Sequence, residues 1–209
     1  MITKSEINPH GICTWQDESA CADCPIQGLI KCRHNWGDLL AFYALFFAGA
    51  LPAGIGMVRG GFGWWILCWF GYAMFFFNVW EAKILCSHCP YYARRGMTLV
   101  CLANHGCLKI WPYNPAPMKK SEKIQFLIGA ILLLAFPLPF MIIGAQWLML
   151  ILTLVGLTSW VLSMQVNVCT RCVNFSCPVN HVPKRVVDTY LRRNPVMLKA
   201  WEESGYKVD

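Results

Sequence analysis

Four long apolar runs constrain this chain more than any other feature. They extend over residues 39–58, 62–85, 124–144 and 147–166. A helix of about 20 residues is about 30 Å long, which matches the hydrocarbon core of a bilayer. Only 14% of the residues are charged, whereas about a quarter are charged in a typical soluble domain. The sequence therefore predicts an all-α integral membrane protein with four transmembrane helices.

The connections between the runs predict the orientation in the membrane. Runs one and two are joined around Gly60, and runs three and four around Ala145. Four spans would place both termini and the central loop on the same side. Of 18 lysines and arginines, only Arg59 falls in a turn on the opposite side, and cytoplasmic loops carry the excess of these residues. We therefore expect a protein of the cytoplasmic membrane with both termini in the cytoplasm.

The chain divides into five expected regions. A polar N-terminal tail lacks the charged start and apolar core of a cleaved signal peptide. In the C-terminal tail, prolines at the start of two short amphipathic stretches predict two short helices. The regions are a cytoplasmic tail (1–36), a transmembrane hairpin (37–85), a cytoplasmic loop (86–120), a second hairpin (121–166) and a cytoplasmic tail (167–209).

Cysteines form three clusters outside the apolar runs. Eleven of the twelve lie on the predicted cytoplasmic side, and Cys68, within the second run, is expected to act as a small apolar residue. Cytosol is reducing, so metal binding explains these thiols better than disulfides do. We expect a small, irregular, metal-stabilised cap on the cytoplasmic face. Its expected ligands are Cys13, Cys21, Cys24 and Cys32, then Cys86, Cys89, Cys101 and Cys107, and finally Cys169, Cys172 and Cys177.

Each cluster contains one C-x2-C pair, which suits both zinc and iron–sulfur centres. Proline follows Cys24, Cys89 and Cys177, as it follows the last cysteine of bacterial ferredoxin runs. None of the segments matches the complete ferredoxin spacing. These features favour two or three iron–sulfur clusters, of the 4Fe-4S type, over structural zinc.

The third cluster has only three cysteines, so its fourth ligand is open. His181 follows Cys177 by four residues and could complete it. An exogenous ligand or a vacant position is an alternative. Sharing of ligands between segments, as ferredoxins share theirs, is the interpretation we favour.

Glu81 and His88 flank Cys86 at the cytoplasmic end of the second run. A charged group at a helix end commonly extends to the lipid headgroups, and this is the simpler interpretation of Glu81. A quinone site is the functional alternative. There Glu81 or His88 would handle protons, and Trp80, Tyr91 and Tyr92 could line the pocket.

These features predict a membrane-anchored iron–sulfur electron-transfer protein. It would link a cytosolic redox partner to the quinone pool or to a partner redox subunit, within or beside a larger membrane complex. One rival is a zinc-stabilised membrane adaptor without redox activity, and another is a membrane enzyme with an open metal–thiolate site. Whether the chain is itself an oxidoreductase stays open. The net charge of +7 fits a face turned toward anionic lipids, so no nucleic-acid partner is expected.

Overall fold

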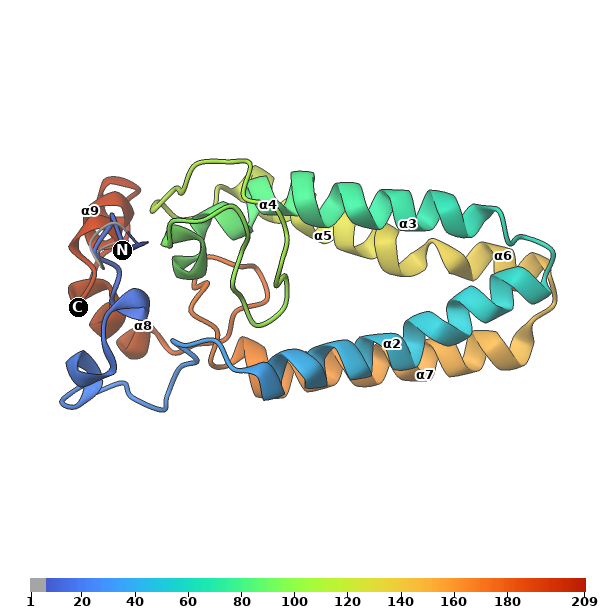
Figure 1. Cartoon of the computed structure of the whole chain (residues 1–209), viewed down its shortest axis with the longest axis horizontal. Helices are drawn as coiled ribbons and strands as arrows, with labels where there is room; N and C mark the ends of the chain where they lie inside the picture. Colours follow the sequence, from blue (N-terminus) through green and yellow to red (C-terminus); the bar gives the residue numbers. More distant parts are fainter. Residues whose placement is uncertain (1–6) are drawn as a thin grey trace.

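The computed structural model of the protein describes residues 7–209. Within this range the chain forms helices and irregular loops, with one isolated bridge between Thr98 and Leu108 and no β-strand. Long helices run side by side, and the cysteine-rich segments gather at one end of them (Figure 1). The two short C-terminal helices, α8 (Lys184–Arg192) and α9 (Pro195–Glu203), lie at that same end.

The closest helix pair joins the first and last long helices. These are α2 (Trp36–Arg59) and α7 (Trp147–Met164), and a π-helix (Gln165–Cys169) continues α7. Two glycines let their backbones touch, because a Cβ atom built on Gly156 would lie 2.6 Å from the Cα atom of Gly49. Small residues at a contact allow such close approach, which is the usual way in which helices associate in a membrane.

The second pair consists of α3 (Trp65–Phe75) and α5 (Lys120–Ala135). Side chains of α3 donate to carbonyl oxygens of α5, the Trp69 indole to Leu133 at 2.8 Å and the Tyr72 hydroxyl to Gly129 at 3.0 Å. Pro137 begins a further helix, α6 (Pro137–Ile143), directly after α5. Its missing N–H and fixed φ explain why the apolar run is divided at this point.

Three helices are long and apolar enough to cross a membrane, namely Trp36–Arg59, Lys120–Ile143 and Trp147–Cys169. Many of their apolar side chains point outward, as do Ile131 (63% exposed) and Val155 (60% exposed). Such surfaces are stable in lipid but not in water. The all-helical part of the prediction is therefore confirmed for the described residues, and three helices have the length and apolar character of membrane spans.

The predicted second span is not one of these three. Residues 62–85 begin with a turn, and the helical part is divided among α3, a π-helix (Phe76–Trp80) and α4 (Glu81–Ile84). The π-helix widens one turn, as π-bulges do when they interrupt an α-helix.

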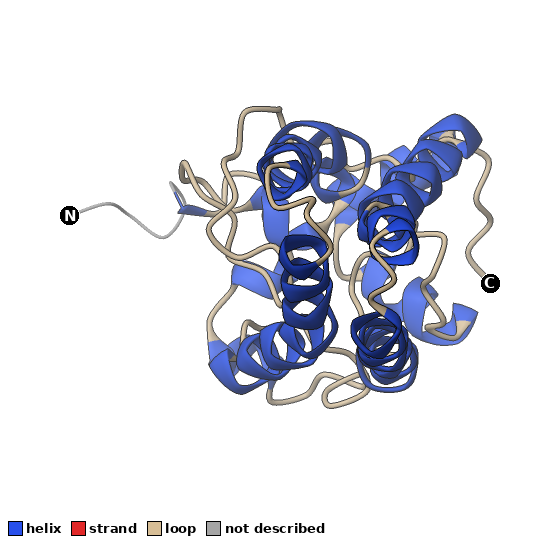
Figure 2. Ribbon diagram, turned by 90° about the vertical axis from the view of Figure 1, so that its right-hand side faces the viewer, coloured by secondary structure: helices blue, strands red, loops and turns tan. Residues whose placement is uncertain are grey.

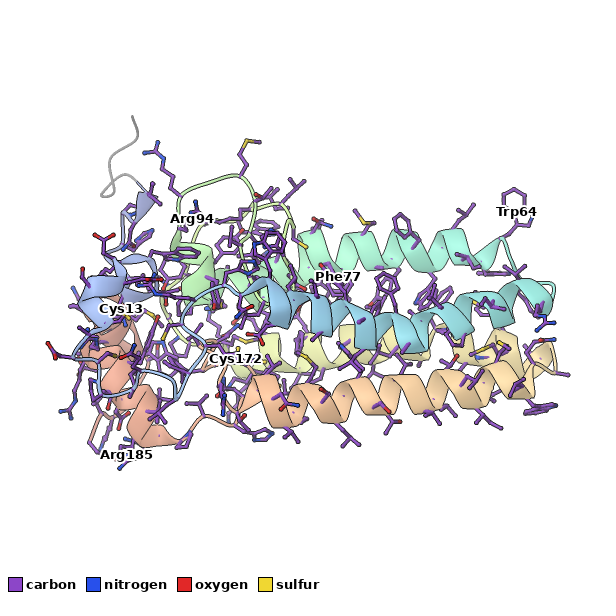
Figure 3. The ribbon with its side chains drawn as sticks, turned by 60° about the horizontal axis from the view of Figure 1, so that its bottom comes forward. Cys13, Trp64, Phe77, Arg94, Cys172 and Arg185 are labelled. Atoms are coloured by element: carbon purple, nitrogen blue, oxygen red, sulfur yellow. The ribbon has the colours of Figure 1, made fainter. Side chains whose placement is uncertain are left out.

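Two tight turns meet at the other end of the helices, where Trp64 also lies (Figures 2 and 3). The first contains Gly61 at φ 87°, and the second contains Ala145 at φ 51°. A Cβ atom on Gly144 would lie 2.7 Å from the Cα atom of Gly60, so the turns are in backbone contact. The contact joins the two helical connections at the end of the molecule that is farthest from the three cysteine-rich segments.

Candidate metal–thiolate site

The three cysteine-bearing segments share one hydrophobic core with α8 and α9. Its most buried members include Ile12 from the first segment, Tyr91 from the second, Val173 from the third and Leu191 from α8. The Lys31 N–H donates to the carbonyl of Arg171 at 2.7 Å, which ties the first segment to the third. Segments more than 100 residues apart are therefore packed into one unit.

Four cysteines of the first segment line one cavity. Short 3₁₀-helices (Cys13–Trp15 and Glu18–Cys21) and the turn at Gly28 fold this segment back on itself. The cavity has a volume of about 20 Å³, which is room for about one water molecule, and it is partly open to solvent. We call its cysteines the N-terminal thiol group: Cys13, Cys21, Cys24 and Cys32.

Hydrogen-bond donors point at sulfur atoms of the N-terminal thiol group. The Asn194 Nδ2 atom lies 3.2 Å from the Cys13 sulfur, and the Arg33 Nη2 atom lies 3.5 Å from the Cys21 sulfur. Burial and the neighbouring thiols raise the pKa of Cys32 to about 12. The free thiol of Cys32 would therefore be neutral at physiological pH, although hydrogen-bond donors around the group suit thiolate sulfur.

The other seven cysteines form a second group, drawn from the central loop and the C-terminal tail. Burial raises the pKa of Cys89 well above its usual value, and Cys101 and Cys172 raise it further. Because these effects cross between the two segments, thiols of the central loop and of the C-terminal tail lie close to one another. We call them the shared thiol group: Cys86, Cys89, Cys101, Cys107, Cys169, Cys172 and Cys177.

Backbone and side-chain amides also face this group. The N–H of Ala103 lies 3.5 Å from the Cys101 sulfur, and the N–H of Asn174 lies 3.5 Å from the Cys172 sulfur. All twelve cysteines are free. Cys13 and Cys172 lie at the same end of the molecule, each with yellow sulfur atoms around it (Figure 3).

Tyr91 lies between the two thiol groups. Its side chain is 1% exposed, and its hydroxyl donates to the carbonyl of Lys31, next to Cys32, at 2.8 Å. Burial raises its pKa, and thiols of both groups, Cys101 and Cys32 among them, raise it further. The Tyr91 side chain therefore lies close to both thiol groups.

Glu81 is buried beside the shared thiol group. Its side chain hydrogen-bonds with Asn104, whose Nδ2 atom also lies 3.4 Å from the Cys86 sulfur. The residue is 6% exposed, and its Oε2 atom has no hydrogen-bond partner. The simpler expectation, a carboxylate that extends to the headgroups, is wrong for this residue.

The histidines singled out in the sequence lie elsewhere. The His88 ring is 3% exposed, with Nδ1 2.6 Å from the carbonyl of Ala116 and Nε2 3.6 Å from the Glu122 carboxylate. His181 is exposed, and its N–H donates to the carbonyl of Cys169 at 3.1 Å. The structure thus buries Glu81 beside the shared thiol group, whereas the His88 ring has other partners and the His181 side chain is exposed.

The expected lining of a quinone pocket is also dispersed. Tyr91 and Tyr92 are buried in the hydrophobic core of the cysteine-rich end. Trp80 instead faces Gln125 of α5, with its indole nitrogen 3.3 Å from the Gln125 Oε1 atom. These three side chains do not form one wall around Glu81.

A single metal ion does not fit the side chains as they are placed. Among residues 7–209, no three histidine, cysteine, aspartate or glutamate side chains converge on a point where they could hold one ion. The N-terminal thiol group instead surrounds a space. Zinc needs sulfur atoms about 2.3 Å from one point, whereas a cubane takes one thiolate at each of four separate irons.

Sequence spacing did not reveal several residues that complete these groups. Asn194 and Asn104 donate to sulfur atoms, but Asn194 is 181 residues from the cysteine it contacts. His34 and His105 stack with their ring centroids 4.7 Å apart, and the His34 Nδ1 atom lies 3.1 Å from the carbonyl of Cys101. Residues brought in by tertiary folding leave no local signal.

Comparison with protein-family models, with curated proteins and with solved structures gave no match. The function is therefore argued from the residues of the chain.

Proposed function

We propose that this chain is a membrane-anchored iron–sulfur protein that transfers electrons between a cytosolic redox partner and the quinone pool or a partner redox subunit. The observation that carries the proposal is the placement of its thiols. Eleven cysteines from three distant segments gather in two groups at one end of a set of apolar helices. The four cysteines of the N-terminal thiol group line one cavity.

The donor set fits iron–sulfur chemistry. Cubane clusters are held by four cysteine thiolates, and hydrogen bonds to the sulfur atoms adjust their potentials. Donors such as Asn194 and Asn104 occupy the corresponding positions in the two groups. When bound, the clusters would supply one-electron storage.

Burial makes metal loading a stabilising event. Ligand thiols must be deprotonated, and burial is the largest cause of the raised pKa of Cys13 and Cys86. A bound metal supplies the positive charge that the buried thiolates lack. We therefore expect loading to release protons and to stabilise the cysteine-rich end.

The membrane arrangement in this proposal has four spans. The helical segment from Trp65 to Ile84 lies beside α5, and it exposes apolar side chains such as Leu67 (62%) and Phe70 (63%). With this segment as the fourth span, the thiol groups lie on one side of the bilayer. The distribution of lysine and arginine supports a cytoplasmic position for that side.

The positions of the two thiol groups suggest a route for electrons through the protein. The shared thiol group follows α4 at the membrane end, whereas the N-terminal thiol group packs against α8 and Arg193. Tyr91 bridges their surroundings. In this proposal the cytosolic partner exchanges electrons at the N-terminal thiol group, and the membrane partner at the shared one.

Metal analysis of the full-length protein, purified in detergent without oxygen, tests this function. We expect iron and acid-labile sulfide, with visible absorption that bleaches when a short-chain quinol or dithionite is added. The variant Cys24→Ser should lose the N-terminal centre, about a third of the iron if there are three cubanes. Cys68→Ser, in α3 and outside both groups, is the matched control and should keep all of it. Stoichiometric zinc without sulfide would refute the electron-transfer function and favour the zinc-stabilised adaptor.

A further inference from the structure

The shared thiol group has one ligand too few for two centres. It contains seven cysteines, whereas four protein ligands are needed for each cubane and for each tetrahedral zinc. Two centres would need eight. An eighth donor would have to be buried, close to several of these thiols and free of other partners.

Glu81 meets these three requirements. It is 6% exposed, and its Oε2 atom has no hydrogen-bond partner. Its carboxylate is near enough to raise the pKa of Cys86, Cys101 and Cys177, which come from both segments of the group. The acid therefore lies beside the shared thiol group, bonded to the Asn104 amide that contacts the Cys86 sulfur.

Asn104 fixes the direction of this carboxylate. Its side chain hydrogen-bonds with Glu81, and its Nδ2 atom lies 3.4 Å from the Cys86 sulfur. The same amide thus holds a cluster sulfur and the acid in one arrangement. The Oε2 atom of Glu81 has no hydrogen-bond partner and is therefore available to bind a metal.

A buried carboxylate with an unpaired oxygen is costly unless a cation is nearby. Iron and zinc both accept carboxylate oxygen as a ligand, so a metal centre would supply that cation. The histidine alternatives are weaker. His181 is exposed, and His88 already contacts Ala116 and Glu122.

We propose that Glu81 is the eighth protein ligand of the shared thiol group, so that one of its two metal centres is held by three cysteines and one carboxylate oxygen. The inference rests on the proposed function only in requiring that the cysteines hold metal. A centre with one oxygen ligand would differ from its all-cysteine neighbour, and it would lie directly at the end of α4.

The test compares Glu81→Gln and Glu81→Cys with the wild-type full-length protein, purified in detergent without oxygen. Glu122→Gln is the matched control, because Glu122 is also an acid at this end of the helices but contacts His88. His181→Ala tests the alternative ligand. The readouts are iron, zinc and sulfide per chain, together with Mössbauer and electron paramagnetic resonance spectra.

We expect Glu81→Gln to lose one centre, about a third of the iron and sulfide if the wild type holds three cubanes. Glu81→Cys should keep the full metal content, with the spectrum of an all-cysteine centre replacing that of the oxygen-ligated iron. Glu122→Gln and His181→Ala should match the wild type. If Glu81→Gln does not fold, the spectral difference between the wild type and Glu81→Cys still shows whether Glu81 is a metal ligand.

Two results would overturn the assignment. One is wild-type metal content and spectra in Glu81→Gln, and the other is loss of a centre in His181→Ala alone. Zinc without sulfide in the wild type would refute the proposed electron transfer but not the ligand, because X-ray absorption would still report an oxygen ligand that Glu81→Gln removes. A wild-type protein without any metal would overturn both proposals.

Discussion

Asp188 shows how a single buried charge holds the C-terminal tail together. It is 5% exposed, and it accepts hydrogen bonds from Lys184 (2.6 Å), from the Tyr206 hydroxyl (2.7 Å) and from the N–H of Asp209 (3.3 Å). Burial by itself would raise the pKa of Asp188, but these donors hold it below the usual 3.8. Because the folded pKa is lowered, the stabilisation is present above about pH 3.8 and is lost as the pH falls through the lower folded value.

We expect Asp188→Asn to loosen α8 and α9 throughout the neutral pH range. Removing a charged acceptor from buried donors typically costs about 1–3 kcal/mol. Hydrogen exchange over residues 184–209 should accelerate accordingly. The control is Glu203→Gln, because Glu203 forms an exposed pair with Lys199 at 4.0 Å, and such pairs contribute little. Equal exchange in both variants would contradict this account.

At the residue scale, the sequence could predict which cysteines gather at one end of the helices but not what surrounds them. Cysteine spacing is local, so Cys86 and Cys89 stand out as candidates without a structure. The positions of Glu81 and Asn104 depend on how the central loop folds back onto α4. The sequence offers His181 as one alternative fourth ligand because it lies near Cys177, but its side chain is exposed.

At the element scale, two π-helices precede two cysteine segments. Phe76–Trp80 lies shortly before Cys86, and Gln165–Cys169 ends on a cysteine. Near the first, the Trp111 indole donates to the carbonyl of Val79 at 3.0 Å, which anchors the central loop. An apolar run that is hydrophobic on every side carries no periodicity that could reveal such a wide turn. This explains why a single uninterrupted span was expected over residues 62–85.

We expect Gly156→Ala to destabilise the α2–α7 pair. An added Cβ atom would lie 2.6 Å from backbone atoms of Gly49, so the helices would have to separate, at a cost of about 1–3 kcal/mol. The opposite sign is expected at Gly54 of α2, where a Cβ atom meets nothing within 4 Å and alanine is the better helix former. Thermal unfolding in detergent, followed by circular dichroism, measures both variants. Equal melting temperatures would show that the contact between the two glycines is not tight.

At the scale of the whole molecule, the two ends differ in chemistry. One end consists of the two turns around Gly60 and Ala145, with Arg59 as its nearby basic residue. The other end carries both thiol groups and the remaining basic residues that the structure describes. The apolar helices between them indicate a bilayer environment, and the charge asymmetry then predicts an orientation.

The orientation and the fourth span can be tested together by labelling introduced cysteines. The sites are Trp64→Cys at the turns (84% exposed), Met97→Cys in the central loop (82% exposed) and Lys199→Cys in α9, where the side chain is 80% exposed. In intact cells, a membrane-impermeant maleimide should label only Trp64→Cys above the unsubstituted parent. After lysis, the other two should react as well, which shows that their protection came from the membrane.

Met97→Cys is the decisive site for the number of spans. With four spans, the segment from Trp65 to Ile84 separates Met97→Cys from Trp64→Cys, so Met97→Cys must stay protected in intact cells while Trp64→Cys is labelled. If the segment from Trp65 to Ile84 did not cross, the central loop would stay on the side of Trp64, and Met97→Cys would be labelled in intact cells. The N-terminal and shared thiol groups could then not belong to one cytoplasmic unit, although their segments share one hydrophobic core. Labelling of Met97→Cys and Lys199→Cys without labelling of Trp64→Cys would instead place the whole cysteine-rich end outside the cytoplasm and contradict the prediction from charge.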